Sequence, residues 1–177
     1  SYGNFDDSFD WQDGWRGQEN TNWYAYQVNT GNYGMEIEAK NTNNSFYPLV
    51  SNITLRRAAG TVTEGGSSAA EYDAIQFKKQ GNGVYTNIVV SGYTTSGATA
   101  VRIQDALTNT DQVVAGKIKI VGIKILDGTS NYSAVSGGSF TTTFAPENFV
   151  TNSSATGATL APGAWATTEG VNLLSNL

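Results

Sequence analysis

Three short apolar runs recur at equal spacing in the middle of the chain. They begin at Ile75, Ile88 and Val101, and turns rich in Gly, Asn or Ser separate them. Apolar residues alternate with other residues within each run, which is the pattern of a strand with one buried face. Equal strands at equal spacing indicate a repeating coil, in which each strand stacks on its counterpart one turn away.

An earlier phrase favours the same architecture. The pair Asn52-Ile53 recurs further along the chain as Asn87-Ile88. We therefore predict an all-β chain whose core is a short right-handed parallel β-helix, with an antiparallel β-sandwich as the alternative. The residues predicted to share one interior are Ile53, Ile75, Phe77, Ile88, Val90, Val101 and Ile103.

The composition favours strands and turns and excludes several kinds of site. The 177 residues suffice for one domain with one sizeable core. Charged residues make up only 14%, and Gly, Ser, Thr and Asn are abundant, which is typical of an all-β chain with many turns. Cys and His are absent, so no disulfide, no Cys- or His-ligated zinc site, no thiol nucleophile and no Ser-His-Asp triad can form.

Charge and hydropathy exclude two kinds of partner. The formal net charge is −5 and the pI about 4.6, so the chain lacks the basic face that nucleic acid requires. No apolar run reaches the roughly 18 residues of a membrane-spanning helix, and we expect no membrane span. The absence of Cys is consistent with a bacterial exported protein.

The segment 1–28 is rich in aromatic side chains. Three of the four Trp lie here, with Phe and Tyr between them. We expect these rings to close the open N-terminal end of the β-helix, because the first coil has no neighbour to cover its core. The alternative is a platform on which sugars stack. The residues predicted for carbohydrate binding are Trp11, Trp15, Trp23 and Tyr24.

Acidic residues gather in the same segment, and two more lie on a predicted strand at 34–41. Dense oxygen ligands are what Ca²⁺ requires, so calcium is the cofactor that we predict. The spacing of the acids is not that of an EF-hand loop, and the alternative is that they cap turns by accepting backbone N–H bonds. The predicted calcium ligands are Asp6, Asp7, Asp10, Asp13, Glu36 and Glu38.

The phrases DDSFDWQDGW, GNYGMEIEAKN, NITLRR and NIVVSGY carry a resemblance. Together they resemble a family of secreted or cell-surface proteins of Bacteroidota, which have a D-x-S-F-D-W-x-x-G-W motif followed by β-helix-like coils. The resemblance covers about residues 4 to 125. It implies the β-helix fold and an extracellular or cell-surface location in bacteria, but no particular chemistry.

Basic residues follow or interleave the predicted strands. We expect stacked coils to bring Arg56, Lys78, Arg102 and Lys119 to nearby outer positions. β-Helix polysaccharide lyases use such residues as the base beside Asp-bound Ca²⁺, which makes polysaccharide cleavage one hypothesis. The alternative is that these charges keep an exposed sheet soluble and block edge pairing.

The composition changes after Asp127, which divides the chain into a predicted core, 1–127, and a tail, 128–177. The tail has no Lys or Arg and is rich in Ser, Thr, Ala and Gly. Such a segment cannot bury much core alone, so we expect it to pack on the flank of the β-helix or on a neighbouring subunit. The apolar residues predicted to take part in assembly are Phe140, Phe144, Phe149 and Trp165.

These observations favour a non-enzymatic extracellular surface or structural protein that self-assembles into a fibre or layer. The two open ends of a short β-helix would allow copies to stack as a homo-oligomer or filament. The alternative is a carbohydrate-binding or polysaccharide-cleaving β-helix module with a glycan as its partner.

Overall fold

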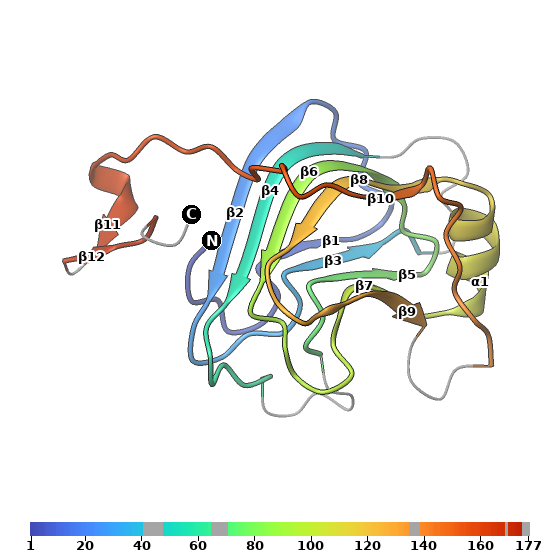
Figure 1. Cartoon of the computed structure of the whole chain (residues 1–177), viewed down its shortest axis with the longest axis horizontal. Helices are drawn as coiled ribbons and strands as arrows, with labels where there is room; N and C mark the ends of the chain where they lie inside the picture. Colours follow the sequence, from blue (N-terminus) through green and yellow to red (C-terminus); the bar gives the residue numbers. More distant parts are fainter. Residues whose placement is uncertain (41–47, 65–70, 135–138, 169, 175–177) are drawn as a thin grey trace.

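The structure is a computed structural model that describes residues 1–40, 48–64, 71–134, 139–168 and 170–174. Two parallel sheets of five strands form the body of the molecule (Figure 1). The odd-strand sheet consists of β1 (Phe9–Trp11), β3 (Met35–Glu38), β5 (Ile75–Lys78), β7 (Thr99–Ile103) and β9 (Ser130–Ala134), in that order. The even-strand sheet consists of β2 (Asn20–Gln27), β4 (Leu49–Arg57), β6 (Gly83–Ser91), β8 (Ile118–Ile125) and β10 (Phe149–Thr151).

Consecutive strands alternate between the two sheets, and each strand pairs in parallel with the strand two places along the chain. This is the arrangement of a short parallel β-helix, in which every turn contributes one strand to each sheet. The predicted β-helix is therefore confirmed, and the β-sandwich alternative is wrong. Among the strands of the described part of the chain, only those of the small hairpin, β11 (Thr167–Thr168) and β12 (Val171–Asn172), pair in an antiparallel manner.

The equal spacing of the three apolar runs proves to be half a turn rather than a full one. Ile75 pairs with Val101 in the odd-strand sheet, one full turn further on. Ile88 lies between them in sequence but belongs to the even-strand sheet, where it pairs with Ile53 and Ile123. The expectation that successive runs stack directly on each other is therefore wrong, because neighbouring runs face each other across the core.

The recurring Asn has a backbone cause. Asn22, Asn52 and Asn87 have φ angles of 61°, 57° and 53°, and Gly122 continues the row at 83°. All four are skipped in the strand register, each opposite the next, so the ladder of the even-strand sheet is interrupted at one level without a shift of register. We call these four residues the left-handed row. Asn and Gly tolerate this left-handed conformation better than other residues, which explains why Asn52-Ile53 recurs one turn later as Asn87-Ile88.

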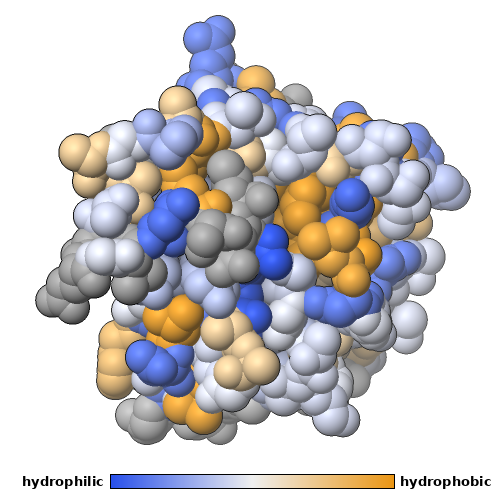
Figure 2. Space-filling view, turned by 60° about the vertical axis from the view of Figure 1, so that its left-hand side comes forward, coloured by the Kyte–Doolittle hydropathy of each residue, from blue (hydrophilic) through white to orange (hydrophobic). Residues whose placement is uncertain are grey.

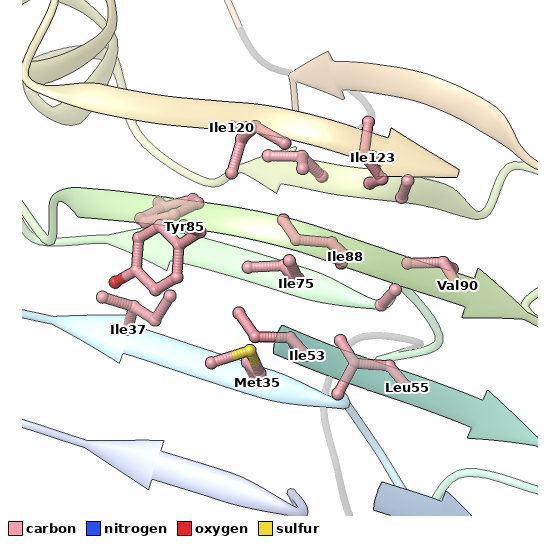
Figure 3. Close-up of a cluster of buried hydrophobic side chains, with 14 of the residues drawn as sticks. Met35, Ile37, Ile53, Leu55, Ile75, Tyr85, Ile88, Val90, Ile120 and Ile123 are labelled. Carbon is pink, nitrogen blue, oxygen red and sulfur yellow. The ribbon is translucent and has the colours of Figure 1, made fainter. Parts of the chain in front are cut away.

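The core lies between the two sheets. Figure 3 shows Ile53 and Ile88 of the even-strand sheet close to Met35 and Ile75 of the odd-strand sheet. Full burial of a side chain of this size contributes roughly 1.5–3 kcal/mol to stability. All seven residues predicted to share the interior are essentially inaccessible to solvent, so that prediction is confirmed.

Aromatic residues close both ends of the stack. At the N-terminal end, Trp11 packs on Trp15 and Trp23, which is the predicted aromatic cap. At the C-terminal end, Phe144 and Phe149 pack on Tyr132 of β9.

The tail crosses the outer face of the even-strand sheet from β10 towards β2 and ends at the hairpin, beyond β2 (Figure 1). Its backbone N–H groups bond to the sheet at three places: Gly157 to Asn87 Oδ1 at 3.2 Å, Ala158 to Thr54 Oγ1 at 2.9 Å, and Thr159 to Asn22 Oδ1 at 2.9 Å. We call residues 152–160 the strap. Two of these acceptors, Asn87 and Asn22, belong to the left-handed row, and the third, Thr54, lies two positions after Asn52.

The connection between β7 and β8 is helical. Residues 106–116 include α1 (Ala106–Thr108) and a π-helical turn η1 (Asn109–Val114), because Asp105 caps the start by accepting the N–H of Thr108 at 2.8 Å. A 3₁₀ turn η2 (Ala164–Ala166) lies in the tail. Among the described residues, no helix is long and apolar enough to cross a membrane.

Candidate functional site

The cations that we expected to line up are divided between the sheets. Lys78 and Arg102 lie on the odd-strand sheet, whereas Arg56 and Lys119 lie on the even-strand sheet, where their register partners include Ser91 and Val84. The expectation of one row of four cations is therefore wrong. It failed because it took the spacing of the apolar runs as a full turn.

The two cations of the odd-strand sheet are bound to carboxylates. Lys78 Nζ lies 2.7 Å from Glu36 Oε1 and 3.6 Å from Glu38 Oε2. Burial lowers the pKa of Lys78, but the hydrogen bond from Lys78 to Glu36 and the charges of Glu36 and Glu38 outweigh it, so the pKa is raised. A strongly protonated ammonium group is a poor general base.

Arg102 is likewise engaged, through five hydrogen bonds that its guanidinium donates. Its guanidinium donates to both carboxylate oxygens of Asp73, at 2.9 and 3.1 Å. Further donors reach Ser133 Oγ and the carbonyl groups of Ala134 and Gly97, each at 2.6 Å. This closed network holds β5, β7 and β9 together and leaves the guanidinium committed to structural bonds.

The six predicted calcium ligands separate into two groups. Three of them come together, since one carboxylate oxygen from each of Asp7, Asp10 and Glu36 lies within 4.8 Å of the others. The remaining three have other partners in the fold: Asp6 accepts from Asn32 at 2.8 Å, Asp13 pairs with Lys40 at 2.5 Å, and Glu38 pairs with Lys78 and Lys79.

The three clustered carboxyl groups share an unfavourable environment. Burial raises the pKa of Asp7 to about 8, and the charge of Glu36 adds to the effect, although the N–H of Tyr33 donates to Asp7 at 2.7 Å. Burial also raises the pKa of Asp10 and of Glu36. A hard cation between three such oxygens would relieve their repulsion, so these are the residues that fit the predicted calcium ion.

The N-terminal end carries a cluster of four aromatic rings. The ring centroids of Phe9 and Trp23 lie 4.7 Å apart, and Trp11 lies 5.0 Å from Trp15 and 5.4 Å from Trp23. Trp11 is buried, while Phe9, Trp15 and Trp23 are each partly exposed. The structure thus brings three of the four predicted carbohydrate-binding residues into one cluster. It places the fourth, Tyr24, on the outer face of the even-strand sheet.

Two open hollows flank this cluster and share Phe9 and Trp23 as walls. The first has a volume of about 370 Å³ and the second about 400 Å³. The first is lined by Ser1, Phe9, Thr21, Asn22, Trp23, Tyr24 and Leu160. The second is lined by Ser8, Phe9, Asp10, Trp11, Trp15 and Trp23. Leu160 belongs to the strap, so the tail forms one wall of the first hollow.

Several buried polar atoms beside these hollows have no hydrogen-bond partner among the residues that the structure describes. They are Ser8 Oγ and Trp11 Nε1 in the lining of the second hollow and the Tyr24 hydroxyl in the lining of the first. Burial raises the pKa of Tyr24 to about 12, so its hydroxyl remains protonated at neutral pH. Unpaired buried polar groups are rare in proteins, and ligand groups or water commonly satisfy them.

Two residues of the second hollow, Ser8 and Phe9, were not predicted as site residues. The alternation Phe9-Asp10-Trp11 places Phe9 on the same side of β1 as Trp11, so a period-two pattern would have identified it. Ser8 gives no such signal, because its importance comes from its burial in the folded chain.

The residues predicted for assembly lie in two places, the C-terminal end of the core and η2. Phe144 is buried, and Phe140 and Phe149 pack partly exposed against the same C-terminal end of the core. Trp165 lies in η2, and its side chain is outside the described part of the structure.

Figure 2 turns the side that carries β2 towards the viewer. Outside the grey residues, apolar surface on this face forms separate patches with polar residues between them. Small hollows between polar neighbours are typical of ligand sites, whereas an obligate protein interface buries a continuous apolar surface.

The fold and this end surface define a parallel β-helix protein with a partly exposed aromatic cluster at its N-terminal end. More particularly, the chain belongs to the pectate-lyase-like β-helix domain family, whose sequence model matches residues 1–169. No curated protein and no solved structure matches the chain.

Proposed function

We propose that this chain is a non-enzymatic glycan-binding β-helix module of a bacterial cell surface. The glycan lies across the N-terminal end, with sugar rings in the two hollows that share Phe9 and Trp23. Membership of a family described by a polysaccharide-cleaving enzyme supports a carbohydrate ligand.

The observation that carries this proposal is the combination of aromatic walls with unsatisfied polar atoms. Ligand pockets are typically lined by aromatic side chains together with a few polar groups that fix orientation. Ser8 Oγ, Trp11 Nε1 and the Tyr24 hydroxyl supply such groups beside Phe9 and Trp23. Sugar hydroxyl groups both donate and accept, so they match all three.

The charged network of the odd-strand sheet argues against the cleavage hypothesis. A uronate lyase needs a base that can lose its proton. Lys78 is held protonated between Glu36 and Glu38, and five hydrogen bonds engage Arg102. We therefore favour binding over cleavage for this chain.

A glycan array followed by calorimetry with the best ligand tests the proposal. Trp15→Ala removes one wall of the second hollow and is expected to weaken binding at least tenfold, about 1.4 kcal/mol. Phe149→Ala is the matched control, because it removes an aromatic ring at the opposite end. Equal loss of affinity in both variants, or none in either, would place binding elsewhere.

Self-assembly is the second candidate function. β1 and β9 are the outer strands of one sheet and β2 and β10 those of the other, so strand edges lie at both ends of the stack. Such edges can pair with another copy. A copy stacked on the N-terminal end would cover the hollows, so a bound glycan is expected to dissociate assemblies. Light scattering at increasing protein concentration, with and without glycan, tests this.

A further inference from the structure

The negative charge of the protein is concentrated in its first coil. Residues 1–40 contain seven acidic and two basic residues, whereas residues 41–177 contain eight of each. The whole formal net charge of −5 therefore comes from the segment that builds the N-terminal end. An uneven charge of this kind attracts ligands of opposite sign and repels those of the same sign.

Asp10 is the acidic residue that lines the second hollow. It lines the hollow with Ser8, Trp15 and Trp23, and its side chain is exposed. Its carboxylate accepts only a long 3.4 Å bond from Gln12 among the hydrogen bonds resolved in the described chain. Ser8 is more than nine-tenths buried, and its Oγ has no hydrogen-bond partner within the described part of the chain.

Other charged groups near Asp10 do not cancel its charge. Asp7 and Glu36 stand within 4.8 Å of it, and the ammonium group of Lys78 is bound to Glu36. Lys40 pairs with Asp13 outside the lining. Arg16 lies in the adjoining loop but lines neither hollow.

Ser1 lines the first hollow rather than the second. Its backbone nitrogen donates to the carbonyl of Tyr24 at 2.8 Å. This group therefore lies in the neighbouring hollow and is engaged with the backbone of β2.

We infer that the second hollow takes a sugar bearing a protonated amine, which makes the ligand an amino-sugar polymer. This inference rests on the proposed glycan-binding function. The ammonium group would contact the Asp10 carboxylate and the indole faces of Trp15 and Trp23, since both attract cations. The unpaired Ser8 Oγ would bond to a sugar hydroxyl. A polyuronate such as pectate would meet repulsion at the same place.

Three soluble probes test the inference by calorimetry: a β-1,4-linked glucosamine oligomer, its N-acetylated form and a galacturonic acid oligomer. The first two have the same backbone and differ in the charge of the amine. The glucosamine oligomer is expected to bind about 3- to 10-fold more tightly than the N-acetylated form, and this preference is expected to shrink in high salt. No binding is expected for the uronate.

Asp10→Asn is expected to abolish the preference for the amine, so that the glucosamine oligomer and its N-acetylated form bind the variant equally. Glu147→Gln is the matched control, because it removes one negative charge from an exposed position at the other end. Equal binding of the charged and neutral oligomers, or tighter binding of the uronate, would overturn the inference and leave glycan binding standing. If none of the three probes binds and the array is also negative, the proposed function fails with it.

Discussion

At the scale of single residues, the left-handed row interrupts the ladder of the even-strand sheet and binds the strap. Asn87 has a φ of 53° and bonds through its side chain to Asn52 at 2.7 Å and to Thr156 at 2.8 and 3.0 Å. Gly122 occupies the corresponding position one turn later. The row therefore needs a left-handed backbone at every turn, and an amide side chain only where a neighbour uses it.

Replacing Asn87 separates the contribution of its left-handed backbone from that of its amide side chain. Asn87→Ala is expected to lower stability by about 2–3 kcal/mol, because it loses the side-chain bonds and forces Ala into a left-handed conformation. Asn87→Gly loses the same bonds without the strain, so it is expected to cost about 1 kcal/mol less. Urea unfolding curves measure both, and equal losses would contradict a contribution from the backbone.

The raised pKa of Asp7 predicts a particular dependence on pH. The unfolded chain loses this proton near the ordinary pKa of 3.8, whereas the folded chain keeps it until about pH 8. The folded state therefore binds more protons between these values, and stability falls as the pH rises from about 4 to about 8.

Asp7→Asn is expected to remove the part of this pH-dependent loss of stability that Asp7 causes. It keeps an acceptor for the N–H of Tyr33, so at pH 8 the variant should exceed the parent protein by about 1–2 kcal/mol, since the carboxyl group is only partly buried. This corresponds to roughly 2–8 °C in Tm. Glu147→Gln is the control for loss of one charge. If the Tm of Asp7→Asn falls with rising pH as much as that of the parent protein, the buried carboxyl group of Asp7 does not cause the pH dependence.

Calcium binding is a separate test of the carboxylate cluster of Asp7, Asp10 and Glu36. If the ion binds Asp7, Asp10 and Glu36, Ca²⁺ raises Tm by mass action and excess EDTA reverses the rise. Asp10→Asn is expected to lose most of this response, whereas Asp13→Asn, whose carboxylate pairs with Lys40, should retain it. A Tm that is the same in Ca²⁺ and in EDTA would mean that these acids serve turns and ion pairs alone.

At the scale of the elements, the strap links the tail to the candidate site. Gly157 has a φ of 70°, and a Cβ there would lie 2.2 Å from Thr54 Oγ1. The strap therefore lies flat on the even-strand sheet only with Gly at this position. Leu160 then reaches the first hollow a few positions further along the chain.

Gly157→Ala is expected to lift the strap, lower Tm and weaken glycan binding. The loss of stability should reach about 1–3 kcal/mol, combining backbone strain with a steric clash. Gly170→Ala is the matched control, because its φ is 79° and its Cβ would meet no atom within 4 Å. Limited proteolysis of the tail reports the lifted strap, and equal protection of both variants would show that close packing at Gly157 is unimportant.

At the scale of the whole molecule, an acidic N-terminal end and an electrically balanced remainder determine the expected behaviour in solution. The charge of the first coil opposes stacking of two N-terminal ends on each other, so any assembly is expected to run head to tail. Electron microscopy of concentrated protein distinguishes filaments from isolated particles. Particles of a single-chain size at all concentrations would reject the assembly function and leave the glycan proposal intact.

The sequence by itself determined the class of fold and the membership of the core. Alternation within the runs that begin at Ile75, Ile88 and Val101 showed which residues face inward, because side-chain direction in a strand is a local property of the backbone. The repeated Asn-Ile phrase marked the same level of two successive turns for the same local reason. Only the tertiary structure decided that the interval between successive runs is half a turn, since the intervening loops differ in length from coil to coil. It also decided that Asp7, Asp10 and Glu36 meet while Asp6, Asp13 and Glu38 bind elsewhere, and that the strap reaches the aromatic end. Contacts between residues so far apart in sequence depend on the register of the stacked strands, which no local pattern encodes.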